Sequence, residues 1–160
     1  MSRDRGPLST FTTFSIIRHP CSRFVSAFNY LTKGGNSGDK KWAAKNIGNS
    51  TLEEFVQKLD LHQWSFAKHE LHLKPQHMQL FYPNGTFGVG LLMCQEGWDV
   101  GMDRLLSVRP DMKGLLPATT HALEMHHEAC AALNPETRSH IEKFYALDYC
   151  TLNPNVHYDD

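Results

Sequence analysis

The sequence predicts an α/β fold in which a short parallel sheet is flanked by helices. Two segments of strand-like composition, 10–17 and 86–94, are each followed by a segment with helical signals. Strands that alternate with helices favour a parallel sheet. The length of 160 residues and the hydrophobic content of 41% are those of an ordinary globular domain. We therefore expect a single domain over residues 1–160.

The first strand and the helix after it have the layout of a phosphate-binding site. Residues from Thr10 to Ile17 are mostly β-branched or aromatic, and Pro20 suits the first position of a helix. Arg18 then lies at the carboxyl end of the strand, where open α/β sheets bind their ligands. The amino terminus of the helix presents unpaired N–H groups and a positive dipole, and both attract an anion.

This helix is expected to have an apolar and a polar face. Residues repeat at helical spacing on each: Phe24, Phe28 and Leu31 on the apolar face, and Ser22, Ser26 and Asn29 on the polar one. Arg18 and Ser26 are eight positions apart. A guanidinium makes paired hydrogen bonds to a phosphate and a hydroxyl completes its shell, so we expect both side chains to hold one phosphate.

The next segments are expected to be less regular. Residues 34–41 are polar and rich in glycine, which indicates a flexible linker. Ser50 and Glu53 form a capping-box pattern that opens a helix to about Leu59. Residues 63–83 show little periodicity and predict a long irregular segment around a short helix.

The second half of the chain continues with a strand and two helices. Residues 86–94 predict a buried strand and 97–106 a helix. Glu96, after that strand, is placed to organise Arg or Lys side chains. From Asn134, an Asn-Pro-Glu sequence supplies a cap, a first-turn proline and an early acid, so a helix should run to about Leu147.

The junction of the first strand and helix resembles a motif of a known family. The sequence Arg18-His-Pro-x-x-Arg23-x-x-Ser26-Ala-Phe is similar to the 3′-phosphate-binding motif of sulfotransferases that use 3′-phosphoadenosine 5′-phosphosulfate, in particular the Golgi carbohydrate sulfotransferases. The resemblance continues more weakly through residues 50–56, 72–76, 87–96 and 133–149.

This resemblance implies a partial P-loop-like sulfotransferase fold and its chemistry. In that family the positions of Arg18 and Ser26 hold the 3′-phosphate of the nucleotide. The resemblance further implies 3′-phosphoadenosine 5′-phosphosulfate as the sulfuryl donor, a carbohydrate hydroxyl as the acceptor, no obligatory metal, and a location in the Golgi or secretory lumen. Two N-x-S/T sequons, at Asn49 and Asn84, are compatible with that location.

Four further residues are candidates for binding the nucleotide or the acceptor. Arg23 lies about one turn past Arg18, where it reaches either the phosphate or an acidic partner. His19 adjoins Arg18 and adds positive charge when it is protonated. By resemblance, Lys74 and Gln76 belong to a loop that the family places near the nucleotide or acceptor; the alternative is a turn before a strand.

One part of the family's pattern is not found in this chain. Upstream of the strand, family members carry a glycine-containing loop with a lysine that cradles the 5′-phosphosulfate, and a catalytic base. Residues 1–9 contain no lysine. We therefore expect the carboxyl-terminal part of the family fold, an unassigned catalytic base and little sulfuryl transfer by this chain alone. The alternative is a non-catalytic module that binds a nucleotide or a sulfated glycan.

The histidines and cysteines predict no metal centre. His69 and His72 are spaced one residue too closely for the H-E-x-x-H zinc-protease pattern, so a metal-dependent hydrolase ranks third among the functions. The four cysteines, Cys21, Cys94, Cys130 and Cys150, form no C-x-x-C pair, which argues against a zinc ribbon or a thioredoxin-like motif. Their spacing assigns no disulfide.

Charge and hydropathy narrow the expected partners. Residues 1–50 contain eight Arg or Lys and two Asp or Glu. Residues 51–160 contain eight Arg or Lys and fifteen Asp or Glu. The basic end coincides with the expected anion site and suits the steering of a nucleotide. The alternative is that Lys40, Lys41 and Lys45 only form a solvated loop. We expect no nucleic-acid partner and no transmembrane segment in this chain. The resemblance implies that in the family a central strand and a helix from the upstream region lie beside the strand at 10–17. Here this apolar strand should therefore have an uncovered edge and face, and we expect self-association.

Overall fold

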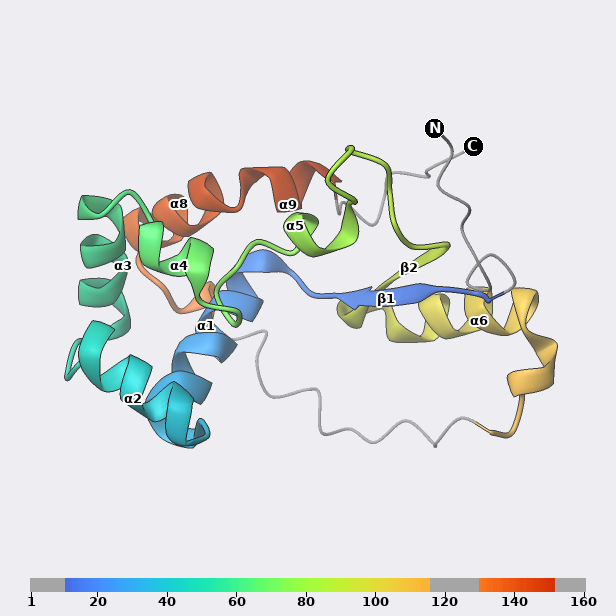
Figure 1. Ribbon diagram of the computed structural model, residues 1–160, viewed down its shortest axis with the longest axis horizontal. Helices are drawn as coiled ribbons and strands as arrows, with labels where there is room; N and C mark the ends of the chain where they lie inside the picture. Colours follow the sequence, from blue (N-terminus) through green and yellow to red (C-terminus); the bar gives the residue numbers. More distant parts are fainter. Residues whose placement is uncertain (1–10, 116–129, 152–160) are drawn as a thin grey trace.

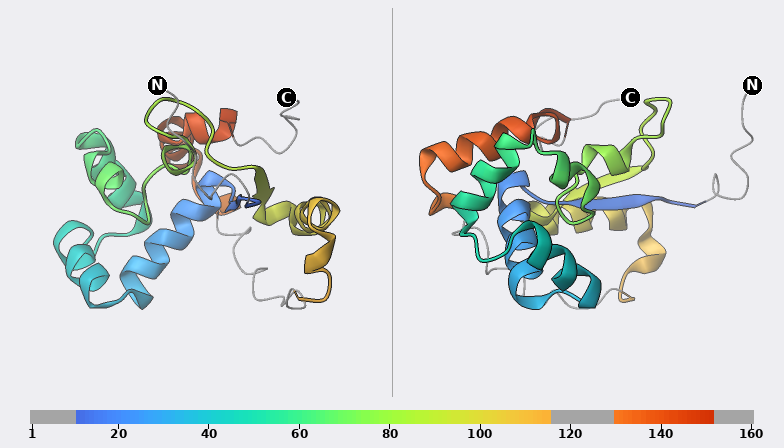
Figure 2. Two further views of the ribbon diagram at one scale, coloured as in Figure 1. Left: turned by 45° about the vertical axis from the view of Figure 1, so that its right-hand side comes forward. Right: turned by 60° about the vertical axis from the view of Figure 1, so that its left-hand side comes forward.

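The computed structural model describes residues 11–115 and 130–151. A small sheet and the helix α6 form one side of the molecule, and most of the other helices gather on the opposite side (Figure 1). The two further views in Figure 2 show the same division. Among the described residues, no helix combines the length and the apolar character needed to cross a membrane.

The sheet consists of two parallel strands. β1 (Phe14–Ile17) pairs with β2 (Leu91–Cys94), with Phe14 opposite Leu91 and Ile17 opposite Cys94. This confirms an α/β fold with a short parallel sheet flanked by helices. Both strands are shorter than expected. The second is shortened because Phe81 pairs with Phe87 across a turn in which Gly85 has a φ of 81°. The start of the first, at Thr10, lies outside the described residues.

Helix α1 (Pro20–Asn29) follows β1 and begins at Pro20, as predicted. Its apolar stripe is in the core, with Phe24, Phe28 and Leu31 at most 9% exposed. The helix continues into a π-helical turn, η2 (Tyr30–Gly34). The polar face is narrower than expected, because α8 packs against α1 and Ser22 is buried.

The linker expected at 34–41 is instead mostly helix. α2 (Ser37–Asn46) begins inside it, with Asn36 as its cap. The Asn36 side chain accepts hydrogen bonds from the N–H groups of Gly38 and Asp39, and the Asp39 carboxylate accepts one from the N–H of Asn36. The linker prediction was wrong because this reciprocal capping stabilises the helix start more than the glycines weaken it.

Helix α3 (Leu52–Leu61) carries the predicted kind of capping box one residue later than expected. Thr51 is the cap: its hydroxyl oxygen accepts a hydrogen bond from the Glu54 N–H, and the Glu54 carboxylate accepts one from the Thr51 N–H. The segment 63–83 contains two short helices rather than one, α4 (Ser65–His69) and α5 (His77–Leu80). The main hydrophobic core forms where α1, α3 and α8 pack together. In it the rings of Phe24 and Phe55 stack at a centroid distance of 6.4 Å.

The remaining named elements of the described chain are helical. The 3-10 turn η3 (Gln95–Gly97) leads into α6 (Trp98–Val108), which packs against β2, and the turn η4 (Pro110–Met112) follows. Asn134 caps α8 (Pro135–Phe144) by accepting a hydrogen bond from the Thr137 N–H, as its position predicted. The helix expected to reach Leu147 is interrupted at Tyr145, after which α9 (Ala146–Thr151) begins.

Helix α6 leaves part of β1 uncovered. Leu91 and Met93 of β2 pack against it, whereas Phe14 and Ile16 of β1 are each 45% exposed. Within the described residues β1 has β2 as its neighbour in the sheet and nothing on its other edge.

A disulfide joins Cys21 in the first turn of α1 to Cys130, with their Cα atoms 5.8 Å apart. Cys21 is fully buried and Cys130 nearly so. The bond ties the start of α1 to the segment that leads into α8, a pairing that the cysteine spacing had left open.

Candidate functional site

The site centres on the junction between β1 and α1. Arg18 and His19 lie between the last strand residue, Ile17, and the first helix residue, Pro20. Among the described residues no side chain caps the amino terminus of α1, and its first turn contains no acidic residue. The free N–H groups and the helix dipole therefore remain available to an anion beside the Arg18 guanidinium.

Gln76 holds the main chain of Arg18 at this junction. Its Oε1 accepts a hydrogen bond from the Arg18 N–H at 2.9 Å, and its Nε2 donates one to the Arg18 carbonyl at 2.8 Å. Gln76 is buried. The structure thus brings one candidate residue to another across 58 positions, and the Gln76 amide bonds to the main chain of Arg18 through both its oxygen and its nitrogen.

Asp148 lies behind Gln76 and is completely buried. Its carboxylate accepts hydrogen bonds from the N–H groups of Gln76 and His77, and it contacts the His77 Nδ1 at 2.6 Å. Sequence reasoning missed this residue. Asp148 carries no local pattern, and only the weak resemblance over 133–149 includes it.

A second carboxylate, that of Glu96, stands at the same helix start. Its Oε1 accepts a hydrogen bond from the His19 N–H at 2.9 Å, and its Oε2 accepts one from the Cys94 thiol. Partial burial lowers the pKa of Arg18 and the negative charge of Glu96 opposes that shift, so the guanidinium stays charged at neutral pH. The expectation that Glu96 organises a cation therefore fits its position beside Arg18.

The free thiol of Cys94 is not activated by this environment. Burial raises its pKa, and the hydrogen bond to Glu96 raises it further. At neutral pH Cys94 therefore stays a thiol, the weakly nucleophilic form.

Ser26 and Arg23 project from α1. Ser26 is partly buried two turns from the helix start. The Arg23 guanidinium interacts with the hydroxyl of Tyr145, and its Nη1 is buried without a hydrogen-bond partner among the described residues. The contact described for the Arg23 side chain is thus with Tyr145, and its expected role toward the phosphate stays a prediction.

Lys74 lies in the loop before α5 and is partly buried. Its backbone N–H bonds to the Glu70 carbonyl, and the hydroxyl of Tyr145 donates to the carbonyl of the preceding Leu73. Burial raises the pKa of Tyr145, which keeps this hydroxyl protonated as a donor. The loop that carries Lys74 and Gln76 is therefore anchored at both ends.

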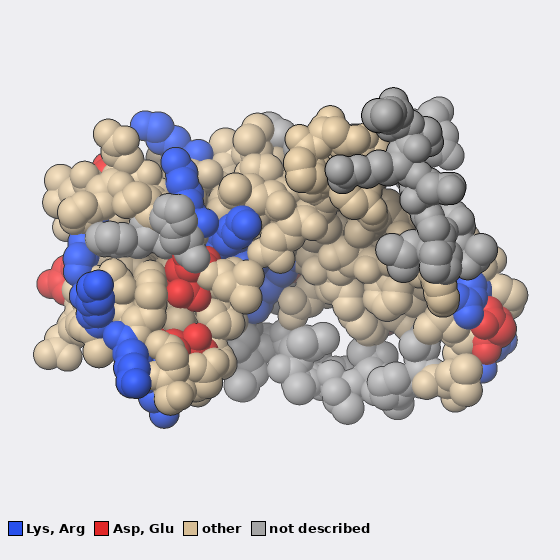
Figure 3. Space-filling view, viewed as in Figure 1, with Lys and Arg blue, Asp and Glu red and all other residues tan. Residues whose placement is uncertain are grey.

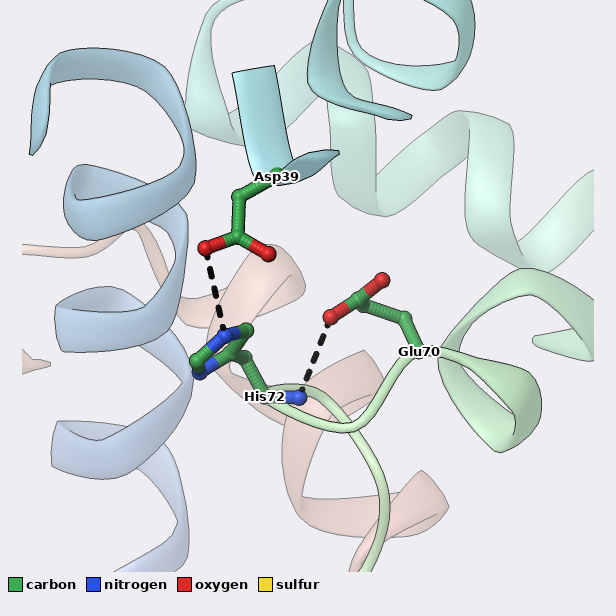
Figure 4. Close-up of side chains that lie close together, drawn as sticks. All are labelled: Asp39, Glu70 and His72. Carbon is green, nitrogen blue, oxygen red and sulfur yellow. Dashed lines mark hydrogen bonds and ion pairs between the residues drawn. The ribbon is translucent and has the colours of Figure 1, made fainter. Parts of the chain in front are cut away.

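Three side chains near α2 come close enough together to share a cation. Asp39, Glu70 and His72 each offer one ligand atom, and these atoms lie within 4.8 Å of one another (Figure 4). Protein partners already engage them: Asp39 caps α2 and lies 3.7 Å from His72, and Glu70 accepts the N–H of His72. His77, five residues after His72, bonds to Asp148.

Positive charge does not collect in one patch on the face seen in Figure 3. Lys and Arg side chains are spread over the helical side of the molecule, with acidic groups between them. At the β1–α1 junction itself, Arg18 and the α1 amino terminus are the local groups that attract an anion.

The comparisons with known proteins agree with the geometry of this junction. The family model described as the sulfotransferase family matches residues 2–87, which is more than half of the chain and includes β1, α1 and the loop of Gln76. Neither curated proteins nor solved structures gave a match. Because this match covers more than half of the chain and includes the strand–helix junction, the chain belongs to the sulfotransferase family.

Proposed function

We propose that this protein takes part in sulfuryl transfer from 3′-phosphoadenosine 5′-phosphosulfate to a carbohydrate hydroxyl. The observation that carries the proposal is the position of Arg18, at the carboxyl end of β1 and beside the uncapped amino terminus of α1. The nucleotide's 3′-phosphate has the charge and size that such a junction binds.

In this proposal four residues surround the 3′-phosphate. Arg18 makes two hydrogen bonds to it, and the N–H groups at the start of α1 donate to the remaining oxygens. Ser26 supplies a hydroxyl, the Arg23 guanidinium adds positive charge, and His19 adds more when it is protonated. The bound phosphate thereby fixes the far end of the nucleotide, which positions the sulfuryl group for in-line attack.

The acceptor side of the proposal rests on the anchored loop before α5. Lys74 stands next to Pro75 and Gln76 in that loop, and its ammonium group suits contact with the hydroxyl groups or acidic substituents of a sugar.

The Golgi or secretory lumen is the proposed location. The disulfide between Cys21 and Cys130 supports it, because such bonds persist in oxidising compartments. Both sequon asparagines, Asn49 and Asn84, are exposed.

The direct test compares two nucleotides that differ only in the proposed phosphate. Calorimetric titration of the purified chain should show that 3′-phosphoadenosine 5′-phosphate binds at least about tenfold more tightly than adenosine 5′-phosphate, since the 3′-phosphate gains charged hydrogen bonds. Equal affinity for the two would contradict the proposal. Incubation with labelled donor and a panel of glycans then asks whether the sulfuryl group is transferred.

Glu96→Gln is expected to tighten binding of 3′-phosphoadenosine 5′-phosphate by about two- to fivefold at low salt, the size of a single charge effect at a helix terminus. The Glu96 carboxylate lies on the His19 N–H and close to Arg18, so it repels an incoming phosphate. Glutamine keeps the acceptor oxygen and removes the charge.

Titration at two ionic strengths checks this, because the gain should shrink as salt screens the charge. Glu142→Gln, on the exposed surface of α8, is the matched control and should leave the affinity unchanged. Weaker binding by Glu96→Gln would show instead that the carboxylate is needed to orient Arg18.

A further inference from the structure

The buried carboxylate of Asp148 has a specific set of partners. It comes from α9, is 0% exposed, and receives the N–H groups of Gln76 and His77 at 2.9 and 3.0 Å. A buried carboxylate is costly unless hydrogen bonds compensate for its lost hydration. Here that compensation comes from the main chain at the start of α5 and from the His77 ring. The position of Gln76 is thereby tied to α9, 72 residues away.

The Gln76 side chain in turn fixes the main chain of Arg18 by two hydrogen bonds. Its amide accepts from the Arg18 N–H and donates to the Arg18 carbonyl, and it is 8% exposed. Glutamine suits this position because its side-chain amide both accepts and donates a hydrogen bond. A glutamate carboxylate has no hydrogen to donate to the Arg18 carbonyl, and an asparagine side chain is one methylene shorter.

Arg18 needs this support because it belongs to neither neighbouring element. The pairing of β1 ends at Ile17 and α1 begins at Pro20, so neither sheet nor helix satisfies the main chain of Arg18. The two bonds from Gln76 supply both missing partners. They also set the direction in which the Arg18 side chain leaves the chain.

We propose that Asp148 and Gln76 are positioning residues for the anion site, with Asp148 acting through Gln76 on Arg18. This inference rests on the proposed function. Under it, Arg18 reaches the 3′-phosphate in a prearranged direction, and this preorganisation raises the affinity for the nucleotide. Neither residue touches the ligand.

A double-mutant cycle separates positioning from a general loss of stability. Gln76→Met keeps the side-chain volume, introduces no charge and removes both bonds to Arg18. It should weaken binding of 3′-phosphoadenosine 5′-phosphate by about fivefold or more, within the usual coupling range for residues in contact. In an Arg18→Ala background the same change should alter the affinity by less than about twofold, because nothing remains to be positioned. Gln79→Met, on the exposed side of α5, is the matched control and should bind as the wild type does.

Asp148→Asn provides the second variant. It keeps the shape but leaves one of the two N–H groups without an acceptor, so its loss of affinity should also shrink in the Arg18→Ala background. Each variant is first shown to be folded by circular dichroism. Hydrogen exchange gives a readout without nucleotide: the Arg18 amide should exchange faster in both variants than in the wild type.

The outcomes distinguish the inference from the function on which it rests. If the wild type does not bind the nucleotide, the proposed function fails and this inference fails with it. If the wild type binds and Arg18→Ala weakens it, but Gln76→Met costs the same in both backgrounds, only the inference is overturned. Unchanged exchange of the Arg18 amide in Gln76→Met would likewise overturn it.

Discussion

Cys21→Ser is expected to lower the free energy of unfolding by about 4–5 kcal/mol, the loop-entropy value for a closed loop of about 100 residues. The disulfide joins positions separated by 109 residues and so restricts most of the unfolded chain. Its loss also removes the link between the start of α1 and the segment that enters α8. We therefore expect a large loss of stability.

Equilibrium unfolding in urea under oxidising conditions measures this change. Cys130→Ser should give a loss of the same size, because either substitution removes the same bond. Cys94→Ser is the control, since Cys94 is a free thiol and the serine hydroxyl can still donate to Glu96. A loss below about 1 kcal/mol for Cys21→Ser would mean that the pairing contributes little to stability.

Arg18→Ala is expected to weaken binding of 3′-phosphoadenosine 5′-phosphate by about 1.5–3 kcal/mol, the range for hydrogen bonds to a charged group. In affinity this is about ten- to hundredfold. The guanidinium stands where the parallel strand β1 ends beside the uncapped start of α1, and partial burial reduces its screening by water. Loss of the side chain leaves the phosphate with the helix N–H groups alone.

Calorimetric titration compares this variant with two others. Arg18→Lys keeps the charge but not the paired hydrogen bonds, so its affinity should fall between those of the wild type and Arg18→Ala. Arg109→Ala removes an arginine paired with Asp111 near the end of α6 and should bind normally. Equal affinities of the wild type and Arg18→Ala would exclude this junction as the phosphate site.

Local signals in the sequence were sufficient for the elements that define the fold class. The β-branched run before Arg18, the proline at position 20 and the apolar spacing of Phe24, Phe28 and Leu31 predicted β1 and α1 correctly. Asn134 predicted the start of α8 in the same way. Each of these signals acts within a few residues along the chain, and for that reason a single sequence reveals it.

Short-range signals also failed where two of them competed. The glycines at 34–41 indicated a linker, but the reciprocal hydrogen bonds of Asn36 and Asp39 start a helix there. The capping box of α3 was placed one residue early, at Ser50, because Ser50 and Thr51 both suit a cap and only the backbone geometry selects Thr51.

The sequence by itself therefore determined the strand–helix junction, the position of Arg18 within it and the family to which the junction belongs. Tertiary structure alone decided what supports that junction. Gln76 reaches Arg18 across 58 positions, Asp148 reaches Gln76 across 72, and Cys21 reaches Cys130 across 109. Such contacts depend on how helices pack around a shared core. Neither periodicity nor local propensity encodes that packing, because both describe one element at a time.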